Sequence, residues 1–155
     1  MMSEDSNSYA KFFAIVATAV AGIVMGCMTF VSFVDVRSFL LHLENKKVEV
    51  IQMHFPIWWP CGRDLMIPLL GCGTLCNAVA AYHYYPGINF VVSATLLAAI
   101  GPYTKIVLGE DIETLRKSNP SQIDETARRF CNLHHVRLVA ATIAFGFALV
   151  ALAEL

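Results

Sequence analysis

The chain has 155 residues, the length of one domain, with 57% hydrophobic and 15% charged residues, whereas soluble domains average roughly 45–50% apolar and about 25% charged. This excess of apolar residues excludes an ordinary soluble domain and indicates lipid as the environment. The formal net charge of −1 at pH 7 removes any general electrostatic case for binding nucleic acid. We therefore expect one integral membrane domain over residues 1–155 whose main partner is the lipid bilayer.

The first apolar run covers residues 12–34 and is long enough to cross a bilayer. Polar residues precede it in place of a basic segment, so we expect an uncleaved first span and no cleavable signal peptide. The segment 35–64 follows and alternates apolar with charged residues. This pattern indicates either a helix on the membrane surface or an extension of the first span, and Pro56 and Pro60 are expected to end it.

The second and third apolar runs cover residues 65–85 and 88–108 and are joined by a Pro-Gly turn at 84–87. Such a short connection predicts an antiparallel hairpin. Residues 109–135 contain a charged helical stretch at 111–117 and, after Pro120, a second short helix. The fourth run, residues 136–152, is the shortest. The predicted fold is all-α, a four-transmembrane-helix bundle of antiparallel up-down topology with short extra helices in the two long loops.

Ten of the eleven Lys and Arg residues fall in or beside the segments 35–64 and 109–135, and Lys11 alone lies on the opposite side. The positive-inside rule predicts that both long loops are cytoplasmic and both termini non-cytoplasmic. In the first span, Gly22 and Gly26 form a GxxxG pattern, which permits close helix packing.

Charged and polar groups near the membrane are the candidate site residues, because lipid makes them costly. In the structural interpretation they pair with one another, with Arg137 next to Asp35 or Asp64, and Asn77 hydrogen-bonds between helices. In the functional interpretation the bundle opens at its cytoplasmic end and binds a small apolar ligand by its polar end. The candidate substrate-binding residues are Asn77, Tyr103, Lys105, Trp58, Asp35 and Arg63.

We expect neither a metal nor another cofactor. The five cysteines show no zinc-type spacing. His134 and His135 are adjacent, so on a helix their side chains point about 100° apart and do not chelate one ion well.

Two short motifs resemble those of the anthrone oxygenase-like family of small four-helix membrane proteins. Pro102-Tyr103-Thr104 matches a Pro-aromatic-Thr motif in the third span, and Leu133-His134 with Arg137 matches a Leu-Asn/His-x-x-Arg motif at the entry to the fourth. The Trp that usually begins the second motif is Phe130 here. Most members of the family have no assigned activity; the characterised one oxidises anthrones to anthraquinones without an obvious metal or flavin.

The resemblance implies a cofactor-independent oxygenase or a protein that binds a phenolic molecule. In the enzymatic version His134 is the general base, Arg137 and Thr104 stabilise the oxyanion, and O₂ reacts with the carbanion. The alternative is a non-enzymatic scaffold, assembly or regulatory protein. It would act through its cytoplasmic loops, as a homo-oligomer or with another membrane protein.

Overall fold

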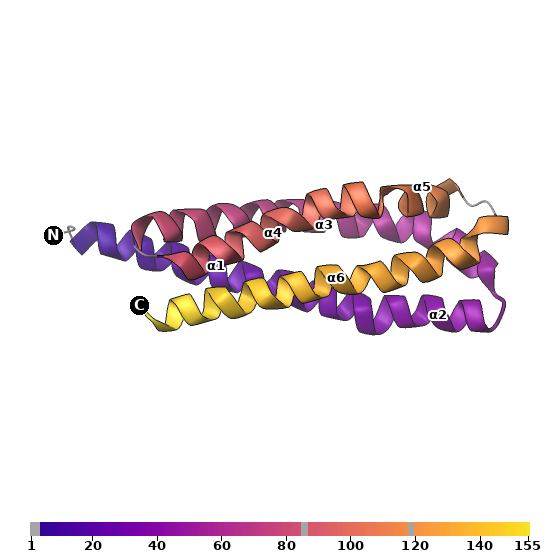
Figure 1. Cartoon of the computed structure of the whole chain (residues 1–155), viewed down its shortest axis with the longest axis horizontal. Coiled ribbons are helices and arrows are strands. Elements are labelled where there is room, and N and C mark those ends of the chain that lie inside the picture. Colours follow the sequence, from indigo (N-terminus) through magenta and orange to yellow (C-terminus); the bar gives the residue numbers. More distant parts are fainter. Residues whose placement is uncertain (1–3, 85–86, 118–119) are drawn as a thin grey trace.

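The computed structural model describes residues 4–84, 87–117 and 120–155, and every element in these ranges is helical. Figure 1 shows one elongated bundle with both chain ends at the same end of the molecule. The elements are α1 (Glu4–Phe30), the π-helix η1 (Val31–Val36), α2 (Arg37–Glu44), α3 (Val48–His83), α4 (Ile88–Val107), α5 (Gly109–Lys117) and α6 (Pro120–Ala153).

Four helical segments are long and apolar enough to cross a membrane: residues 8–44, 48–83, 88–107 and 122–153. Only 22–39% of the residues in their apolar windows are buried inside the protein. Large side chains such as Phe12, Ile67 and Val139 point outward instead and are 55–62% exposed. Lipid is the solvent that suits such a surface. The structure confirms the prediction of an all-helical protein with four helices that are long and apolar enough to span a membrane.

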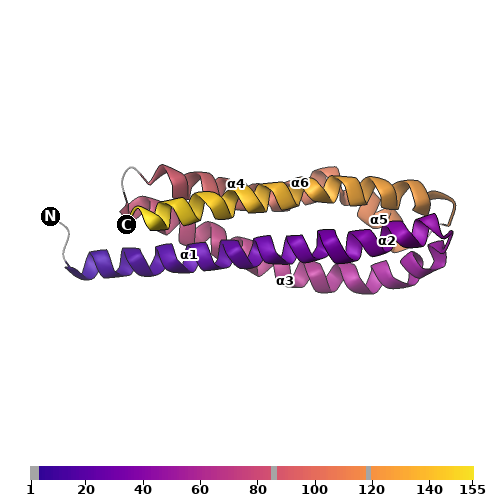
Figure 2. The same cartoon turned by 90° about the horizontal axis from the view of Figure 1, so that it is seen from below.

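The segment 35–64 is not a loop. Helix α1 continues through η1 into α2 as far as Glu44, and α3 begins at Val48. The 36 residues of α3 extend over about 54 Å at 1.5 Å per residue, whereas the hydrocarbon core of a bilayer measures about 30 Å. Helix α3 is therefore longer than one crossing requires. Its first half, residues 48–64, lies at the end of the bundle opposite the termini, which we call the projecting end (Figure 2).

The expectation that Pro56 and Pro60 end a helix is wrong, because both lie inside α3 together with Pro68. Proline removes one backbone hydrogen bond and strains the preceding turn, which tertiary packing can offset. Here Phe55 is fully buried and its ring lies 5.3 Å from that of Phe130, edge to face. The packing of Phe55 stabilises the turn next to Pro56 and offsets the cost of the proline inside α3.

The prediction of a short helix after Pro120, separate from the fourth span, is also wrong. The structure has a single helix, α6, from Pro120 to Ala153. In the predicted turn between α3 and α4, Tyr85 and Pro86 lie outside the described residues.

The π-helix keeps one face of the first helix in the core. Met28, Ser32 and Val36 are buried at a strict spacing of four residues, which would drift around an α-helix of 3.6 residues per turn. The i→i+5 bonding of η1 accommodates more residues per turn and holds these positions on one side.

Small residues bring α1 and α6 together. Each helix carries a stripe of buried alanines, and Thr18 Oγ1 on α1 donates a hydrogen bond of 3.2 Å to the Ala148 carbonyl on α6. Close backbone approach of this kind is how helices associate in lipid. The stripes are Ala10, Ala14, Ala17 and Ala21 on α1, and Ala141, Ala144, Ala148 and Ala151 on α6.

The two glycines of the GxxxG pattern differ in their surroundings, which gives a matched pair of variants. A Cβ at Gly22 would lie 3.1 Å from Phe145 Cε2, whereas a Cβ at Gly26 would meet nothing within 4 Å. We expect Gly22→Ala to lower the free energy of unfolding by about 1–3 kcal/mol through overpacking. Gly26→Ala should leave it unchanged or raise it by up to about 1 kcal/mol through helix propensity.

Unfolding of the detergent-solubilised protein by SDS, followed by circular dichroism, measures both variants. Equal losses for the two would contradict the close contact between Gly22 and Phe145.

Candidate ligand-binding site

A cavity of about 630 Å³ lies between α3 and α4, with α5, α1 and α6 contributing to its walls. This volume is within the range of roughly 300–1,000 Å³ that is usual for small-molecule sites. Met66 and Leu70 on α3 and Ile100 on α4 line the part nearer the chain termini, while Arg63 and Lys105 lie nearer the projecting end. The lining residues are Met28, Trp59, Gly62, Arg63, Met66, Ile67, Leu70, Ile100, Gly101, Thr104, Lys105, Gly109, Ile112, Glu113, Arg116 and Arg137.

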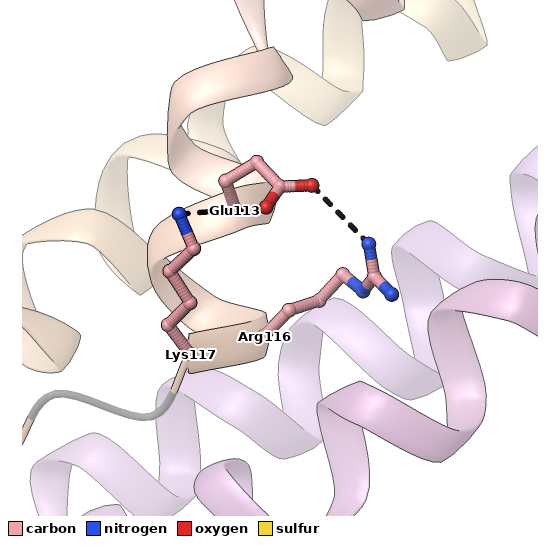
Figure 3. Close-up of polar contacts among 3 residues, drawn as sticks. All are labelled: Glu113, Arg116 and Lys117. Carbon is pink, nitrogen blue, oxygen red and sulfur yellow. Dashed lines mark hydrogen bonds and ion pairs between the residues drawn. The ribbon is translucent and has the colours of Figure 1, made fainter.

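The charged lining is predominantly cationic. Four cations face a single carboxylate, Glu113. Glu113 is already engaged on α5, by Arg116 at 3.2 Å and by Lys117 at 3.8 Å (Figure 3). Arg63 pairs with its neighbour Asp64 at 2.7 Å. Lys105 and Arg137 are the other two cations.

Arg137 is the most deeply buried charge of the cavity, with 5% of its surface exposed. Its guanidinium contacts His134 Nδ1 and lies over the rings of Trp59 and Phe130, with Cζ 5.8 and 5.7 Å from their centroids. Cation–π contacts of this kind attract the charge but do not neutralise it. The Nε atom is buried without a hydrogen-bond partner in the described part of the chain.

The predicted acidic partner of Arg137 is wrong for both candidates. Asp35 Oδ2 accepts a hydrogen bond of 3.1 Å from Trp58 Nε1, and Asp64 pairs with Arg63. Across residues 4–84, 87–117 and 120–155, no carboxylate forms an ion pair with Arg137. The reason is the register of the helices, because α3 places Trp58 beside Asp35, while α6 places Arg137 against Trp59, Phe130 and His134.

His134 is 1% exposed and lies behind Arg137 without lining the cavity. A guanidinium only donates hydrogen bonds, so Nδ1 of His134 must be the acceptor and the ring proton belongs on Nε2. Nε2 faces the Met28 carbonyl at 3.5 Å. In this arrangement His134 is a neutral ring with both nitrogens directed at protein groups, and it holds the guanidinium in place.

The structure brings four of the predicted site residues to one cavity: Thr104, Lys105, Arg63 and Arg137. Thr104 donates its hydroxyl to the Ile100 carbonyl at 2.8 Å, which leaves an oxygen lone pair available. Five others lie elsewhere. These are His134, Tyr103, Asp35, Trp58 and Asn77. Tyr103 donates a hydrogen bond of 3.2 Å to the Leu133 carbonyl, and Trp58 donates one to Asp35. Asn77 donates a hydrogen bond of 2.7 Å to the Gly73 carbonyl of its own helix.

Trp59 and Arg116 line the cavity but were not predicted from the sequence. A signal for Trp59 existed. Trp59, Arg63, Met66 and Leu70 follow the i, i+4, i+7, i+11 spacing of one helix face. The prediction that Pro60 ends a helix separates Trp59 from Arg63, Met66 and Leu70, so the four residues are not recognised as one helix face.

Within the described residues, no group of three His, Cys, Asp or Glu side chains is placed to hold a metal ion. No family model, curated protein or solved structure matches the chain. Membership of the anthrone oxygenase-like family therefore stays a prediction that rests on the residues of its two motifs.

Helix α5 forms one wall of the cavity and is anchored to α6 by Asp111, which is 5% exposed and lies 3.5 Å from Arg129 Nε. Burial raises the pKa of the Asp111 carboxyl above its ordinary value of 3.8; Arg129 offsets part of this rise and Glu110 adds to it. The folded state therefore binds this proton more tightly than the unfolded state does.

It follows that the contribution of Asp111 to stability is greatest below pH 3.8 and is lost as pH rises through the higher folded-state pKa. We expect Asp111→Asn to raise the melting temperature at pH 7 and to flatten its dependence on pH. The measurement is thermal unfolding in detergent between pH 4 and 8. The control is Asp124→Asn, which removes an exposed ion pair to Arg128 and should change little. A lower melting temperature for Asp111→Asn at pH 7 would mean that the Arg129 pair outweighs burial.

Proposed function

We propose that this chain is a multi-pass membrane protein that binds one small, largely apolar molecule in the cavity between α3 and α4. The molecule's polar end would lie at Arg137 and Thr104, and its apolar part along Met66, Leu70 and Ile100. The observation that carries this proposal is the combination of an apolar lining with one buried, unpaired guanidinium in a cavity of about 630 Å³. Binding sites typically combine an apolar wall with a few convergent polar groups.

The distribution of basic residues supports an orientation for this site. With the segments 35–64 and 109–135 in the cytoplasm and both termini outside, the cationic end of the cavity would lie at the cytoplasmic membrane boundary. The apolar part would then lie within the cytoplasmic leaflet, at a depth open to molecules dissolved in lipid.

Oxidation of a bound phenol is the extension that the family resemblance suggests, with Arg137 and Thr104 at the oxyanion. A general base needs a free lone pair within reach of the substrate proton. In the described geometry, His134 Nδ1 is occupied by Arg137. The base role would require Arg137 to turn toward the substrate and release that nitrogen, so binding is the function that the geometry supports best.

Trp59 provides a direct test of binding, because it lines the cavity while Trp58 is bonded to Asp35. In a Trp58→Phe variant in lipid nanodiscs, 4-bromo-1-naphthol should quench the fluorescence of Trp59 saturably through its heavy atom. In the reciprocal Trp59→Phe variant, Trp58 should show only the linear quenching that is expected of a probe dissolved in lipid.

A space-filling variant provides the control. A side chain at Gly101 would enter open space at the cavity wall, and one at Gly71 on α3 would enter open space away from it. We expect Gly101→Phe to abolish the saturable component and Gly71→Phe to preserve it. Linear quenching of Trp59 in the Trp58→Phe protein would mean that this phenol does not bind in the cavity.

The orientation has its own test. Cysteine probes at Lys46 and Lys117, in a background lacking the five native cysteines, should react with an impermeant maleimide only from the cytoplasmic side. A probe at Tyr9 should react only from the other side. Labelling in the reverse pattern would invert the topology.

A further inference from the structure

We infer that the molecule bound in this cavity is a single-chain amphiphile whose polar end is an oxyanion, a carboxylate or a phosphate, that pairs with Arg137. The inference rests on the proposed function and specifies its ligand class. It follows from an imbalance of charge around Arg137, from the surplus of cations at the cavity, and from the side on which the cavity opens.

The imbalance is local to Arg137. Guanidinium groups stay protonated, and a buried cation normally has an anionic partner. Only 5% of the surface of Arg137 is exposed. Its contacts are a neutral imidazole and two aromatic rings. Its Nε–H has no acceptor among the described residues. An oxyanion in the adjoining cavity would supply both the missing charge and the missing acceptor, in the bidentate geometry that Arg favours.

The protein does not supply that anion from the rest of the cavity wall. Glu113 is the one carboxylate among the lining residues, and both of its oxygens face cations of its own helix, as Figure 3 shows. Lys105 lines the cavity and makes no hydrogen bond or ion pair with another described residue. The electrostatic potential inside the cavity is therefore positive, which disfavours a cationic ligand. A neutral phenol carries no negative charge that could pair with Arg137.

The exposure of the wall indicates how the ligand enters. Ile67 lines the cavity and is 62% exposed. Gly101 opposite is exposed, with open space where a Cβ would be. Both lie within spanning helices, so the cavity opens sideways toward lipid. A chain-bearing molecule from the bilayer fits this opening, with its head at the Arg137 level, near the membrane boundary, and its chain beside Met66 and Leu70.

Photo-crosslinking of the full-length protein in phosphatidylcholine nanodiscs tests the inference. The probe is a palmitic acid analogue with a mid-chain diazirine and a terminal alkyne, compared with the matching alcohol. Crosslinks at Met66 and Leu70 are mapped by mass spectrometry and normalised to Leu75, which faces lipid on the same helix and is 68% exposed. A charge-assisted pair predicts that the acid labels the cavity about tenfold more than the alcohol, with no difference at Leu75.

Arginine variants assign this preference to one residue. Arg137→Gln should reduce cavity labelling by the acid to the level of labelling by the alcohol. Arg137→Lys, which keeps the charge, should retain a preference for the acid. The matched control is Arg128→Gln on the same helix, whose exposed side chain pairs with Asp124, and it should behave as the parent. If Arg137→Gln does not fold, the comparison of acid with alcohol in the parent protein still decides.

Competition identifies the source of the oxyanion. Displacement of the acid by lysophosphatidic acid, and not by inorganic phosphate, supports a membrane amphiphile. Displacement by inorganic phosphate alone indicates a water-soluble anion, which would overturn the amphiphile while keeping the oxyanion site. Equal labelling of the cavity by acid and alcohol would overturn the inference while leaving the proposed function intact. The absence of cavity labelling together with saturable quenching of Trp59 by bromonaphthol would also overturn the inference and leave the proposed function intact. If both cavity labelling and saturable quenching are absent, the proposed function fails as well.

Discussion

Helices in lipid gain nothing from the hydrophobic effect by touching each other, so the bundle depends on how closely its backbones can approach. The interface between α1 and α6 meets this constraint with two alanine stripes and a hydroxyl that reaches from one helix to the carbonyl of the other. The interface between α3 and α4 is different at the projecting end. Gly62 and Gly101 face open space there, and the cavity occupies the gap. The bundle therefore combines a close contact between α1 and α6 with a cavity between α3 and α4.

Beyond the apolar half, the same helices build a second core of a different kind. Phe39, Phe55 and Phe130 are almost fully buried, and Trp58 and Trp59 pack against them. In water such a cluster is driven together by burial of its large rings. The packing changes from alanine to aromatic side chains along the bundle, toward the end where the charged residues gather. Arg137 lies where the two regimes meet, fixed by rings from the aromatic side and by His134 behind it.

A guanidinium at that depth is costly unless something compensates it, and natural membrane proteins keep such groups mainly for function. The protein compensates Arg137 only in part. Two ring faces and a neutral imidazole orient it, and its buried Nε–H has no acceptor within the described residues. This partial compensation distinguishes Arg137 from Arg129, Arg128 and Arg116, which all have carboxylate partners. It also connects the fold to the proposed function, since the same packing that buries Arg137 leaves it beside a cavity with a largely apolar lining.

The sequence by itself determined the four spanning helices, because a run of apolar residues reports its own preference for lipid whatever its neighbours are. It also identified four residues of the cavity wall, Thr104, Lys105, Arg63 and Arg137. Charged residues and motif residues at the ends of apolar runs can be recognised without a structure. Only the tertiary structure decided that α3 continues through Pro56 and Pro60, that Asp35 bonds to Trp58 instead of Arg137, and that Trp59 lines the cavity. The physical reason is that these outcomes depend on the register of one helix against another. That register is set by the fit of side chains distant in sequence, such as Phe55 against Phe130, and no local pattern encodes that fit.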